Sequence, residues 1–358
     1  MIKVLHVLPH RGGGGETYID LLERMPGFAH ERFYLSTGRS PASALVSIPR
    51  RWPALVARLR VADLLHVHGD VASAIVLPLL RRRPAVVTTQ GLHLLRRARG
   101  VRRRAVSRAM RTVASAARAV ICSSVAERDE LAHIVHPRDA RKLQVIYNAT
   151  VPPAPGDPVD RLAVREQLGV GADCVLGLFA GQLEARKAPL LAAAAAAQLD
   201  AAGLPFVLAV AGDGPQAGEL QPFADRGAIR LLGHRDDLPR LLRAADIFVQ
   251  PSEREGMSFV LLEAMAHGLA VVAADGAGNP EALGEAGLLF PAGDEPALVA
   301  ALSELAGDPA RRERLGTQAA ARVAEHFDLG RFLAETEAVY SAALGFREPG
   351  RGAGGSPA

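Results

Sequence analysis

Short apolar runs bounded by glycine, proline or polar residues alternate with longer helical patterns along almost the whole chain. This alternation is typical of a mostly parallel sheet whose strands are joined by crossover helices. The candidate strands of the first half are Lys3–Leu8, Arg32–Ser36, Leu64–His68, Ala85–Thr89, Ala119–Cys122 and Gln144–Tyr147. Those of the second half are Cys174–Ala180, Phe206–Ala211, Ile229–Leu232, Ile247–Gln250 and Ala270–Ala273. We therefore predict an α/β chain with a separate sheet in each half.

A proline-rich segment, VPPAPGDPVD at 151–160, separates the two halves. Its prolines cannot continue a helix interior or a central strand, so we predict a linker there. An N-terminal domain then covers 1–150, a C-terminal domain covers 161–330, and a helical pattern follows over 331–346. The tail at 347–358 is rich in glycine and proline, so we predict that it is disordered. A chain of 358 residues with 49% hydrophobic residues can fill two cores.

The cysteines and the longest apolar stretches indicate the compartment. Cys122 and Cys174 both lie in apolar stretches and form no disulfide framework. The apolar run at the N-terminus is short and leads into a glycine loop, so we expect a first strand rather than an export signal. The longest apolar region, Leu190–Gly212, is interrupted by polar residues and proline before it could span a membrane. We therefore predict a cytoplasmic protein.

Two glutamates, Glu255 and Glu263, lie eight residues apart where a predicted strand leads into a helix. The amides at the start of that helix belong to Gly256, Met257, Ser258 and Phe259. Such amides can hold an anion, and a carboxylate on either side can accept hydrogen bonds from several hydroxyls. The pattern predicts a site for a hydroxyl-rich anion, although a helix with two solvated glutamates would show the same spacing.

A glycine run, Gly12–Gly15, follows the first strand and precedes a helix. It lacks the Gly-Lys-Ser/Thr ending of a P-loop and the G-x-G-x-x-G spacing of a dinucleotide site. A dehydrogenase is therefore disfavoured. We expect a flexible loop at the ligand edge of the sheet, and a glycine turn without function is the alternative.

The segment from Pro251 to Asp275 resembles the signature of retaining glycosyltransferase family 4, two glutamates separated by seven residues. The matching residues are Pro251, Ser252, Glu255, Gly256, Glu263, Ala264, Met265, Ala266, Gly268, Val271 and Val272. The resemblance covers nearly the whole chain and implies the GT-B fold, in which two Rossmann-like doubly wound domains face a central cleft. It implies that Glu255 contacts the donor sugar and Glu263 the ribose hydroxyls. It also implies that the helix at 331–346 crosses back onto the N-terminal domain.

The resemblance extends to the parts that hold the donor phosphates. In the segment GLFAGQLEARKAP it assigns Lys187 to the diphosphate, whereas Gln182 stands where the family usually has arginine. Neighbouring Arg186 is the candidate for the missing charge. Gly14 and Gly15 resemble the family's glycine loop, whose amides approach the donor phosphates or sugar.

Two further stretches of the C-terminal half resemble donor-binding parts of the family. Gly212 belongs to a glycine turn, for which a tight turn without ligand contact is an equally good interpretation. His234 and Arg235 lie in the stretch that frames the nucleobase. Adjacent Asp236 and Asp237 stand at a predicted helix start, where acids more often serve the N-terminus than a metal. We therefore predict no metal site.

The resemblance places Gln90 where the family usually has a histidine near the reacting centre. Glutamine can orient a hydroxyl but cannot titrate, so His93 is the nearest candidate for proton transfer. His66 is expected to point into the core beside its strand. For His68 and His93, a core role and a ligand role are both open.

An arginine-rich segment lies between Arg81 and Arg111. Its interleaved apolar residues are Leu94, Leu95, Val101, Val106 and Met110. They would suit docking on an anionic membrane that carries a lipid-linked acceptor, and a solvated helix face is the alternative. Nucleic acid is disfavoured because the segment has no aromatic residue to stack on bases.

The resemblance implies a retaining glycosyltransferase that moves a sugar from a nucleoside-diphosphate donor to a hydroxyl acceptor, without a cofactor. Cell-surface polysaccharide, glycolipid or glycoside synthesis is the expected context. Glu255, Lys187, Gln90 and His93 are the predicted catalytic residues. Because Gln90 and Gln182 replace usual functional residues, a non-catalytic sugar-nucleotide-binding protein is one alternative. A sugar-nucleotide epimerase of the same architecture is another.

Overall fold

The computed structural model describes residues 1–36, 38, 41–154 and 158–346. Its contacts divide the chain into two units, Met1–Tyr147 with Gly330–Ala358 and Asn148–Leu329. The last helix therefore returns to the first unit. None of the described helices combines the length and the apolar character that a transmembrane span requires.

The first unit is built on a six-stranded parallel sheet in the order β2-β1-β3-β4-β5-β6. The strands are β1 (Ile2–Leu8), β2 (Phe28–Tyr34), β3 (Leu64–His68), β4 (Ala85–Thr88), β5 (Ala119–Cys122) and β6 (Leu143–Val145). The helices are α1 (Gly14–Leu22), α2 (Pro41–Val61), α3 (Asp70–Ile75), α4 (His93–Arg97), α5 (Gly100–Ala116), α6 (Val125–Ala132), α7 (Pro137–Ala140) and α16 (Leu329–Leu344), with a 3₁₀ turn at Leu77–Leu79.

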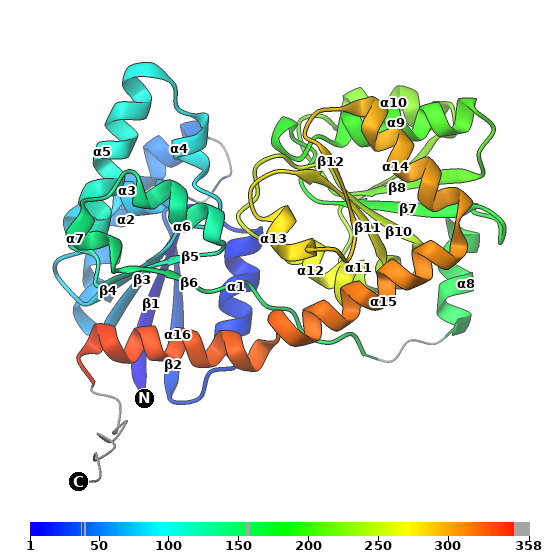
Figure 1. Cartoon of the computed structure of the whole chain (residues 1–358). Helices are drawn as coiled ribbons and strands as arrows, with labels where there is room; N and C mark the ends of the chain where they lie inside the picture. The colour runs from blue at the N-terminus through cyan, green and yellow to red at the C-terminus, as the bar shows by residue number, and fades with distance from the viewer. Residues whose placement is uncertain (37, 39–40, 155–157, 347–358) are drawn as a thin grey trace, which may run out of the picture. The chain divides into compact units, whose positions relative to one another are not determined.

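Side chains alternate between the two faces of this sheet. Leu5 and Val7 of β1 join a core that includes Leu55 of α2 and Val113 of α5. The opposite face packs against α1 and α16, and Figure 1 shows α16 running across this unit. The Tyr18 ring meets Phe332 edge-on at 5.0 Å, and the Tyr340 hydroxyl lies 2.6 Å from Nδ1 of His66. Burial of these aromatic rings attaches α16 to the first unit.

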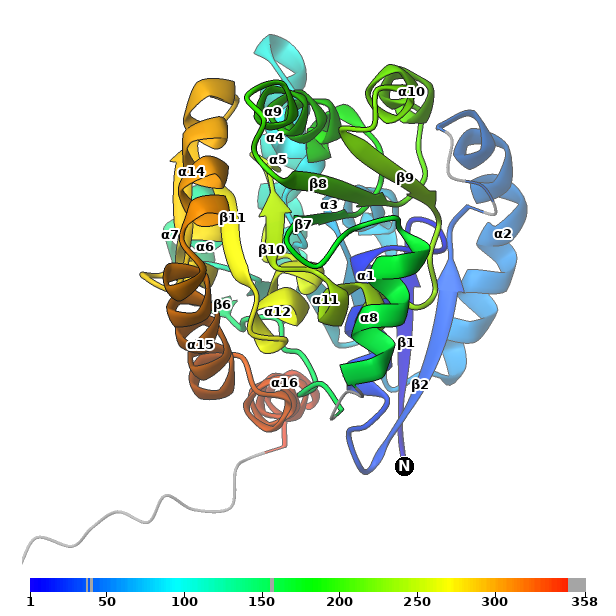
Figure 2. The same cartoon turned by 90° about the vertical axis from the view of Figure 1, so that its right-hand side faces the viewer.

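The second unit has its own six-stranded parallel sheet, in the order β12-β11-β10-β7-β8-β9. The strands are β7 (Val175–Ala180), β8 (Phe206–Ala211), β9 (Ile229–Gly233), β10 (Ile247–Gln250), β11 (Ala270–Asp275) and β12 (Leu288–Pro291). The helices are α8 (Pro158–Gln167), α9 (Pro189–Ala201), α10 (Ala217–Asp225), α11 (Leu238–Ala244), α12 (Phe259–Ala266), α13 (Asn279–Leu283), α14 (Glu295–Gly307) and α15 (Pro309–His326), with a 3₁₀ turn at Ala185–Lys187. Figure 2 shows α9, α10 and α14 on one face and α8, α11, α12 and α15 on the other.

The differences from the predicted strands are largest at sheet edges. β2 covers Phe28–Tyr34 instead of Arg32–Ser36, and β12, at Leu288–Pro291, has no counterpart among the predicted strands. Both strands end their sheets and are only partly buried, so neither needs a continuous apolar run. Periodicity in the sequence is therefore weakest there.

The proline-rich linker is shorter than predicted. Helix α8 begins at Pro158, inside the predicted span of 151–160. Proline is favoured in the first turn of a helix, because the N–H that it lacks has no partner there. Residues 155–157 and the tail at 347–358, predicted to be disordered, lie outside the described residues.

Candidate donor and acceptor sites

Two loops of the second unit meet at the carboxyl ends of neighbouring strands. The loop after β7 carries Arg186 and Lys187, and the loop after β10 carries Glu255. Both cations reach the same carboxylate oxygen, Oε1 of Glu255, at 2.8 Å from Arg186 Nη1 and 2.7 Å from Lys187 Nζ. Glu255 is 7% exposed, so this is a concentrated and largely desolvated charge cluster. It brings together three of the predicted site residues.

The arginine of this cluster has a second acid that sequence reasoning missed. Glu184 accepts from Nη2 of Arg186 at 2.7 Å and thereby orients the guanidinium. The available signal was the acid two residues before the adjacent bases in the segment LEARK. Gln182 lies half-buried at the start of the same loop, where its carbonyl accepts from the Glu184 amide at 2.9 Å.

Helix α12 begins beside Glu255, as predicted, with Ser258 at the N-cap. The first amides of a helix lack intrahelical partners, so those near Ser258 and Phe259 can bind an anion. Glu263 lies in this helix, and burial raises the pKa of its carboxyl to about 7. Among the described residues we find no hydrogen-bond partner for this carboxylate, which suits a group that receives ligand hydroxyls.

The loop that carries Glu255 is fixed by backbone packing against a second loop. A Cβ on Gly278 would meet the carbonyl oxygen of Gly256 at 1.6 Å, so only glycine fits there. The Gly278 amide donates to the Glu255 carbonyl at 3.2 Å, and buried Asn279 donates to the Ser252 carbonyl at 3.1 Å. The GAGNPE segment after β11 was not predicted as part of the site, although its glycines after a strand end were a usable signal.

The close backbone packing of another loop explains Gly212 without a ligand. Its φ is +144°, and a Cβ would meet the carbonyl oxygen of Gly181 at 1.8 Å. Gly214 is likewise packed, with a Cβ position 2.4 Å from the carbonyl oxygen of Leu183. The close approach of two backbone segments therefore accounts for both glycines, and it supports the interpretation as a tight turn.

The predicted nucleobase stretch carries two close pairs of polar side chains. Arg235 donates to both carboxylate oxygens of Asp237 at 2.7 Å each, and His234 lies 3.2 Å from exposed Asp236. Asp237 occupies the N-cap of α11 but makes no side-chain cap bond, because Arg235 takes its carboxylate. Asp237 therefore lies at the helix start, as predicted, with its side chain held by Arg235.

In the first unit, the turn after β4 has an unusual backbone. Gln90, Gly91 and Leu92 have φ values of +48°, +106° and +48°, so three successive residues are left-handed. His93 begins α4 and packs over Gly91, where a Cβ would lie 2.5 Å from its Cε1 atom. Oε1 of Gln90 faces Gly15, at 3.2 Å from the Cβ position of that glycine. The turn therefore places Gln90 and His93, both predicted site residues, at the end of β4.

The predicted glycine loop is shorter than expected. Gly14 and Gly15 form the first turn of α1, and only Gly12 and Gly13 are non-helical, both with positive φ. Glu16 accepts from the Gly12 amide at 2.5 Å, which ties the loop to the helix. The amides of Gly14 and Gly15 thus belong to a helix N-terminus, where they can still face an anion.

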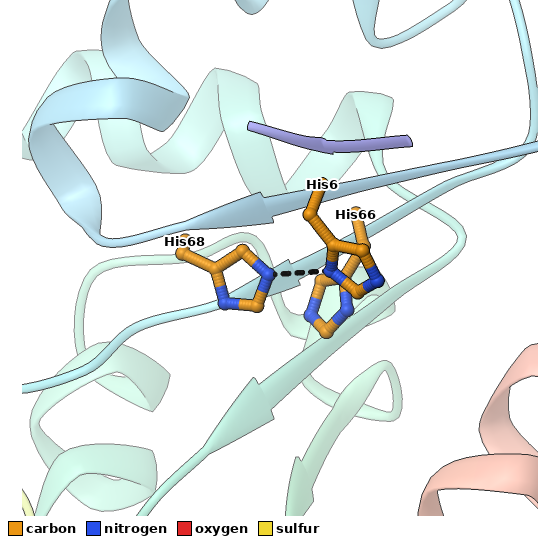
Figure 3. Close-up of side chains that lie close together, drawn as sticks. All are labelled: His6, His66 and His68. Atoms are coloured by element: carbon orange, nitrogen blue, oxygen red, sulfur yellow. Dashed lines mark hydrogen bonds between the residues drawn. The ribbon is translucent and has the colours of Figure 1, made fainter. Parts of the chain in front are cut away.

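Histidines of β1, β2 and β3 form a hydrogen-bonded chain that ends at Gln90, and Figure 3 shows the link between His6 and His68. Nε2 of Gln90 lies 3.3 Å from Nδ1 of His68, Nε2 of His68 lies 2.9 Å from Nδ1 of His6, and Nε2 of His6 lies 2.8 Å from Nδ1 of His30. The Gln90 amide can only donate, so each imidazole in turn accepts at Nδ1 and donates from Nε2. Burial lowers the pKa of His68 to about 3, so the chain is neutral. His66 and His68 are both fully buried.

The ring nitrogens of His6, His66 and His68 lie within 4.8 Å of one another, a separation at which they could gather around a metal ion. His66, however, already bonds Tyr340 and Thr88 through its two nitrogens. An ion would have to break these bonds and bury its charge among aromatic rings. The cluster is better explained as a hydrogen-bonded network.

The apolar residues of the arginine-rich segment do not form a membrane-docking face. Leu95 and Met110 are fully buried, and Val106 packs against the same core, so the apolar side of α5 faces inward. Of the apolar residues predicted to dock, Val101 is the one exposed, at 79%. Arginines therefore dominate the outer side of this helix.

Two family models match the chain. The one described as Glycosyltransferase Family 4 covers residues 11–151, and the one described as Glycosyl transferases group 1 covers 175–308. D-inositol 3-phosphate glycosyltransferase from Kineococcus radiotolerans is 34% identical over 67% of this chain and 61% of its own length. Alpha-maltose-1-phosphate synthase from Mycolicibacterium smegmatis is 33% identical over 64% of each chain. The match thus spans less than two thirds of these relatives.

Solved structures establish the fold. Sucrose-phosphate synthase from Thermosynechococcus elongatus superimposes with a TM-score of 0.80 at 20% identity, covering 96% of this chain and 100% of that one. The Anabaena protein HepE, solved in complex with UDP-glucose, gives a TM-score of 0.79 at 21% identity with the same coverage. The predicted GT-B fold is confirmed.

Proposed function

Because the chain belongs to the glycosyl transferases group 1 family, glycosyltransferase family 4, we propose that it is a glycosyltransferase using a nucleoside-diphosphate sugar. The observation that carries this proposal is the cluster of Arg186 and Lys187 on Glu255, beside the start of the helix that contains the Glu263 carboxylate. UDP and UDP-glucose bind to HepE, a protein of the same fold, which agrees with this donor class.

The proposed donor exchanges partners with the cluster. Without donor, Glu255 pairs with both cations, and Glu184 supplies the second negative charge through Arg186. The diphosphate then takes Arg186 and Lys187, because phosphate oxygens bind several charged donors at once. Glu255, released from the cations, accepts hydrogen bonds from the sugar hydroxyls, and Glu263 accepts from the ribose. Both cations stay paired throughout, and the Glu255 carboxylate exchanges its two cations for hydroxyl donors.

The proposed transfer proceeds with retention. The acceptor oxygen bonds to the anomeric carbon on the face from which the diphosphate departs, and the hydroxyl proton passes to the leaving phosphate oxygen. Lys187, Arg186 and the amides at the start of α12 stabilise the charge that develops on the diphosphate. Gln90 and His93 are proposed to orient the acceptor hydroxyl. We propose no metal or other cofactor, since the cations already serve the diphosphate and Asp237 is held by Arg235.

The acceptor is proposed to be a sugar, a lipid-linked hydroxyl or a small molecule. The exposed arginines of α5 favour an anionic acceptor or an anionic membrane surface, by charge and without apolar insertion. Both cysteines are free, in keeping with a cytoplasmic location.

We expect Arg186→Gln to weaken nucleoside-diphosphate binding about tenfold, because one charge-assisted contact is lost. In that background, Gln182→Arg should restore most of the affinity, since it returns a cation to the same loop. Calorimetric titration of the single and double variants measures both steps. An Arg186→Gln variant with unchanged affinity would remove Arg186 from the donor site.

Glu263 should make nucleotide binding pH-dependent. Its raised pKa means that the folded protein holds this proton between pH 4.5 and about 7, where the unfolded chain has lost it. The free energy of unfolding therefore falls as pH rises through this window. Ribose hydroxyls favour the charged carboxylate, so affinity should rise from pH 6 to pH 8. Glu263→Gln should lower affinity about tenfold and flatten both dependences.

Titrations at pH 6, 7 and 8, with unfolding curves alongside, test this expectation. Glu253→Gln is the matched control, because that glutamate is solvent-exposed in the neighbouring loop. A Glu263→Gln variant with the wild-type pH slope would show that another group titrates.

The proposed function is tested by a donor screen. The purified protein is titrated with UDP, GDP, ADP and TDP sugars, with magnesium or with a chelator, and then assayed for transfer to hydroxyl acceptors. Selective binding with transfer and retained anomeric configuration supports the proposal. If the donor binds but is neither transferred nor epimerised, the non-catalytic alternative is favoured. If a new epimer of the donor sugar forms when no acceptor is present, the epimerase is favoured. No binding to any donor overturns the proposal.

A further inference from the structure

We propose that Glu127 is a positioning residue of the transfer reaction, which holds the Gln90–Leu92 turn and through it the Gln90 side chain. This inference rests on the proposed function. It begins from the backbone of the turn, which places three successive residues in the left-handed region. Side chains at Gln90 and Leu92 disfavour that conformation, so the surrounding structure must hold it.

The Glu127 carboxylate makes the required contacts. It is fully buried in the first turn of α6, and it accepts from the Gly91 amide at the centre of the turn. The Thr89 hydroxyl donates to its Oε2 at 2.6 Å, from the residue that enters the turn. The amide and hydroxyl of Ser123 donate to the same oxygen at 2.8 and 2.7 Å, which anchors the carboxylate to the end of β5.

A second buried carboxylate holds the exit of the turn. Oδ2 of Asp70 accepts from the amides of Leu94 and Leu95 at 2.6 and 3.1 Å, in the first turn of α4. The turn is thus attached to β5 through Glu127 and to α3 through Asp70. Asp70 accepts from two backbone amides, and Glu127 accepts from two backbone amides and two hydroxyls, so both carboxylates set where the chain runs.

The side chain of Gln90 has its own independent restraint. Its amide donates to His68, at the end of the imidazole chain, while Oε1 faces Gly15 at the start of α1. A rotation of the turn would break the bond to His68 and free the tautomer of that ring. Glu127 thereby acts on the Gln90 side chain through the turn, without a direct contact between the two side chains in the described structure.

The experiment compares Glu127→Gln, Gln90→Ala and the double variant. The amide of Glu127→Gln must point a donor at the Gly91 or Ser123 amide, so the turn should shift. We expect the acceptor kcat/KM to fall about 10- to 50-fold in either single variant, and no further in the double variant. Donor affinity, measured by titration, should be unchanged. Thr89→Val, which removes one hydroxyl donor, is the gentler variant if Glu127→Gln fails to fold.

Asp139→Asn is the matched control, because Asp139 is another buried carboxylate of the first unit and pairs with Lys142 away from the turn. It should lower stability without changing kcat/KM. Nitrogen-15 spectra of the histidines provide a readout that needs no acceptor. The wild type should show His68 protonated at Nε2, and Glu127→Gln, Gln90→Ala and Thr89→Val should each mix the tautomers.

Two results would overturn the inference. One is multiplicative loss of kcat/KM in the double variant, which would mean that Glu127 and Gln90 act separately. The other is an unchanged His68 tautomer in both Glu127→Gln and Thr89→Val. A wild type that transfers no sugar from any donor would instead refute the proposed function, and the spectra would still decide whether Glu127 holds the turn.

Discussion

Lys187→Ala is expected to lower kcat about 10²- to 10³-fold, because a preorganised charge on the departing diphosphate is lost. The ammonium lies 2.7 Å from Glu255, and its side chain is 13% exposed, so water replaces it poorly. Nucleoside-diphosphate affinity should fall as well. Folding should persist, since Arg186 still neutralises Glu255 in the empty site. Rate assays at saturating donor and calorimetric titration measure the two effects.

The matched control is Lys3→Ala, which removes another of the few lysines from an exposed position on β1. It should leave both kcat and affinity unchanged. If Lys187→Ala retained a third or more of the wild-type kcat, the diphosphate would have to bind elsewhere.

Gly278→Ala is expected to reduce transfer by about 10²-fold or more, because the loop that carries Glu255 must move. The added Cβ lies 1.6 Å from the Gly256 carbonyl oxygen, where real contacts need at least 3.0 Å. Both partners are backbone, so no side-chain rotation relieves the clash. Stability should fall by about 1–3 kcal/mol, the usual cost of overpacking. Transfer assays and thermal unfolding measure the two losses, and donor titration follows the affinity.

Gly218→Ala separates this effect from a general effect of glycine replacement. Gly218 lies in α10, where a Cβ meets nothing within 4 Å, and alanine is favoured in helices by about 1 kcal/mol. This variant should therefore be fully active and slightly more stable. Wild-type donor affinity in Gly278→Ala would mean that the two loops do not set the position of Glu255.

The central strands show how far sequence patterns reach. Leu64–His68, Ala119–Cys122, Phe206–Ala211 and Ile247–Gln250 were predicted with their observed bounds. Parallel strands with helices on both faces are mostly apolar, so runs of consecutive apolar residues indicate them. Edge strands lack that signal, and the prediction failed for β2 and β12.

The sequence by itself determined the α/β class, the two halves, the family, the positions of Glu255 and Lys187 after strand ends and the position of Glu263 in the following helix. These follow from local apolar runs and from motifs read along the chain. Tertiary structure alone decided that Arg186 meets Glu255, that Gly278 packs on Gly256, and that Glu127 holds the turn at Gln90. Each of these contacts joins two segments that follow different strands. Sheet order and register decide which of these segments come close together. A linear pattern can indicate that a residue is buried, but the partner of a buried charge is chosen by the fold.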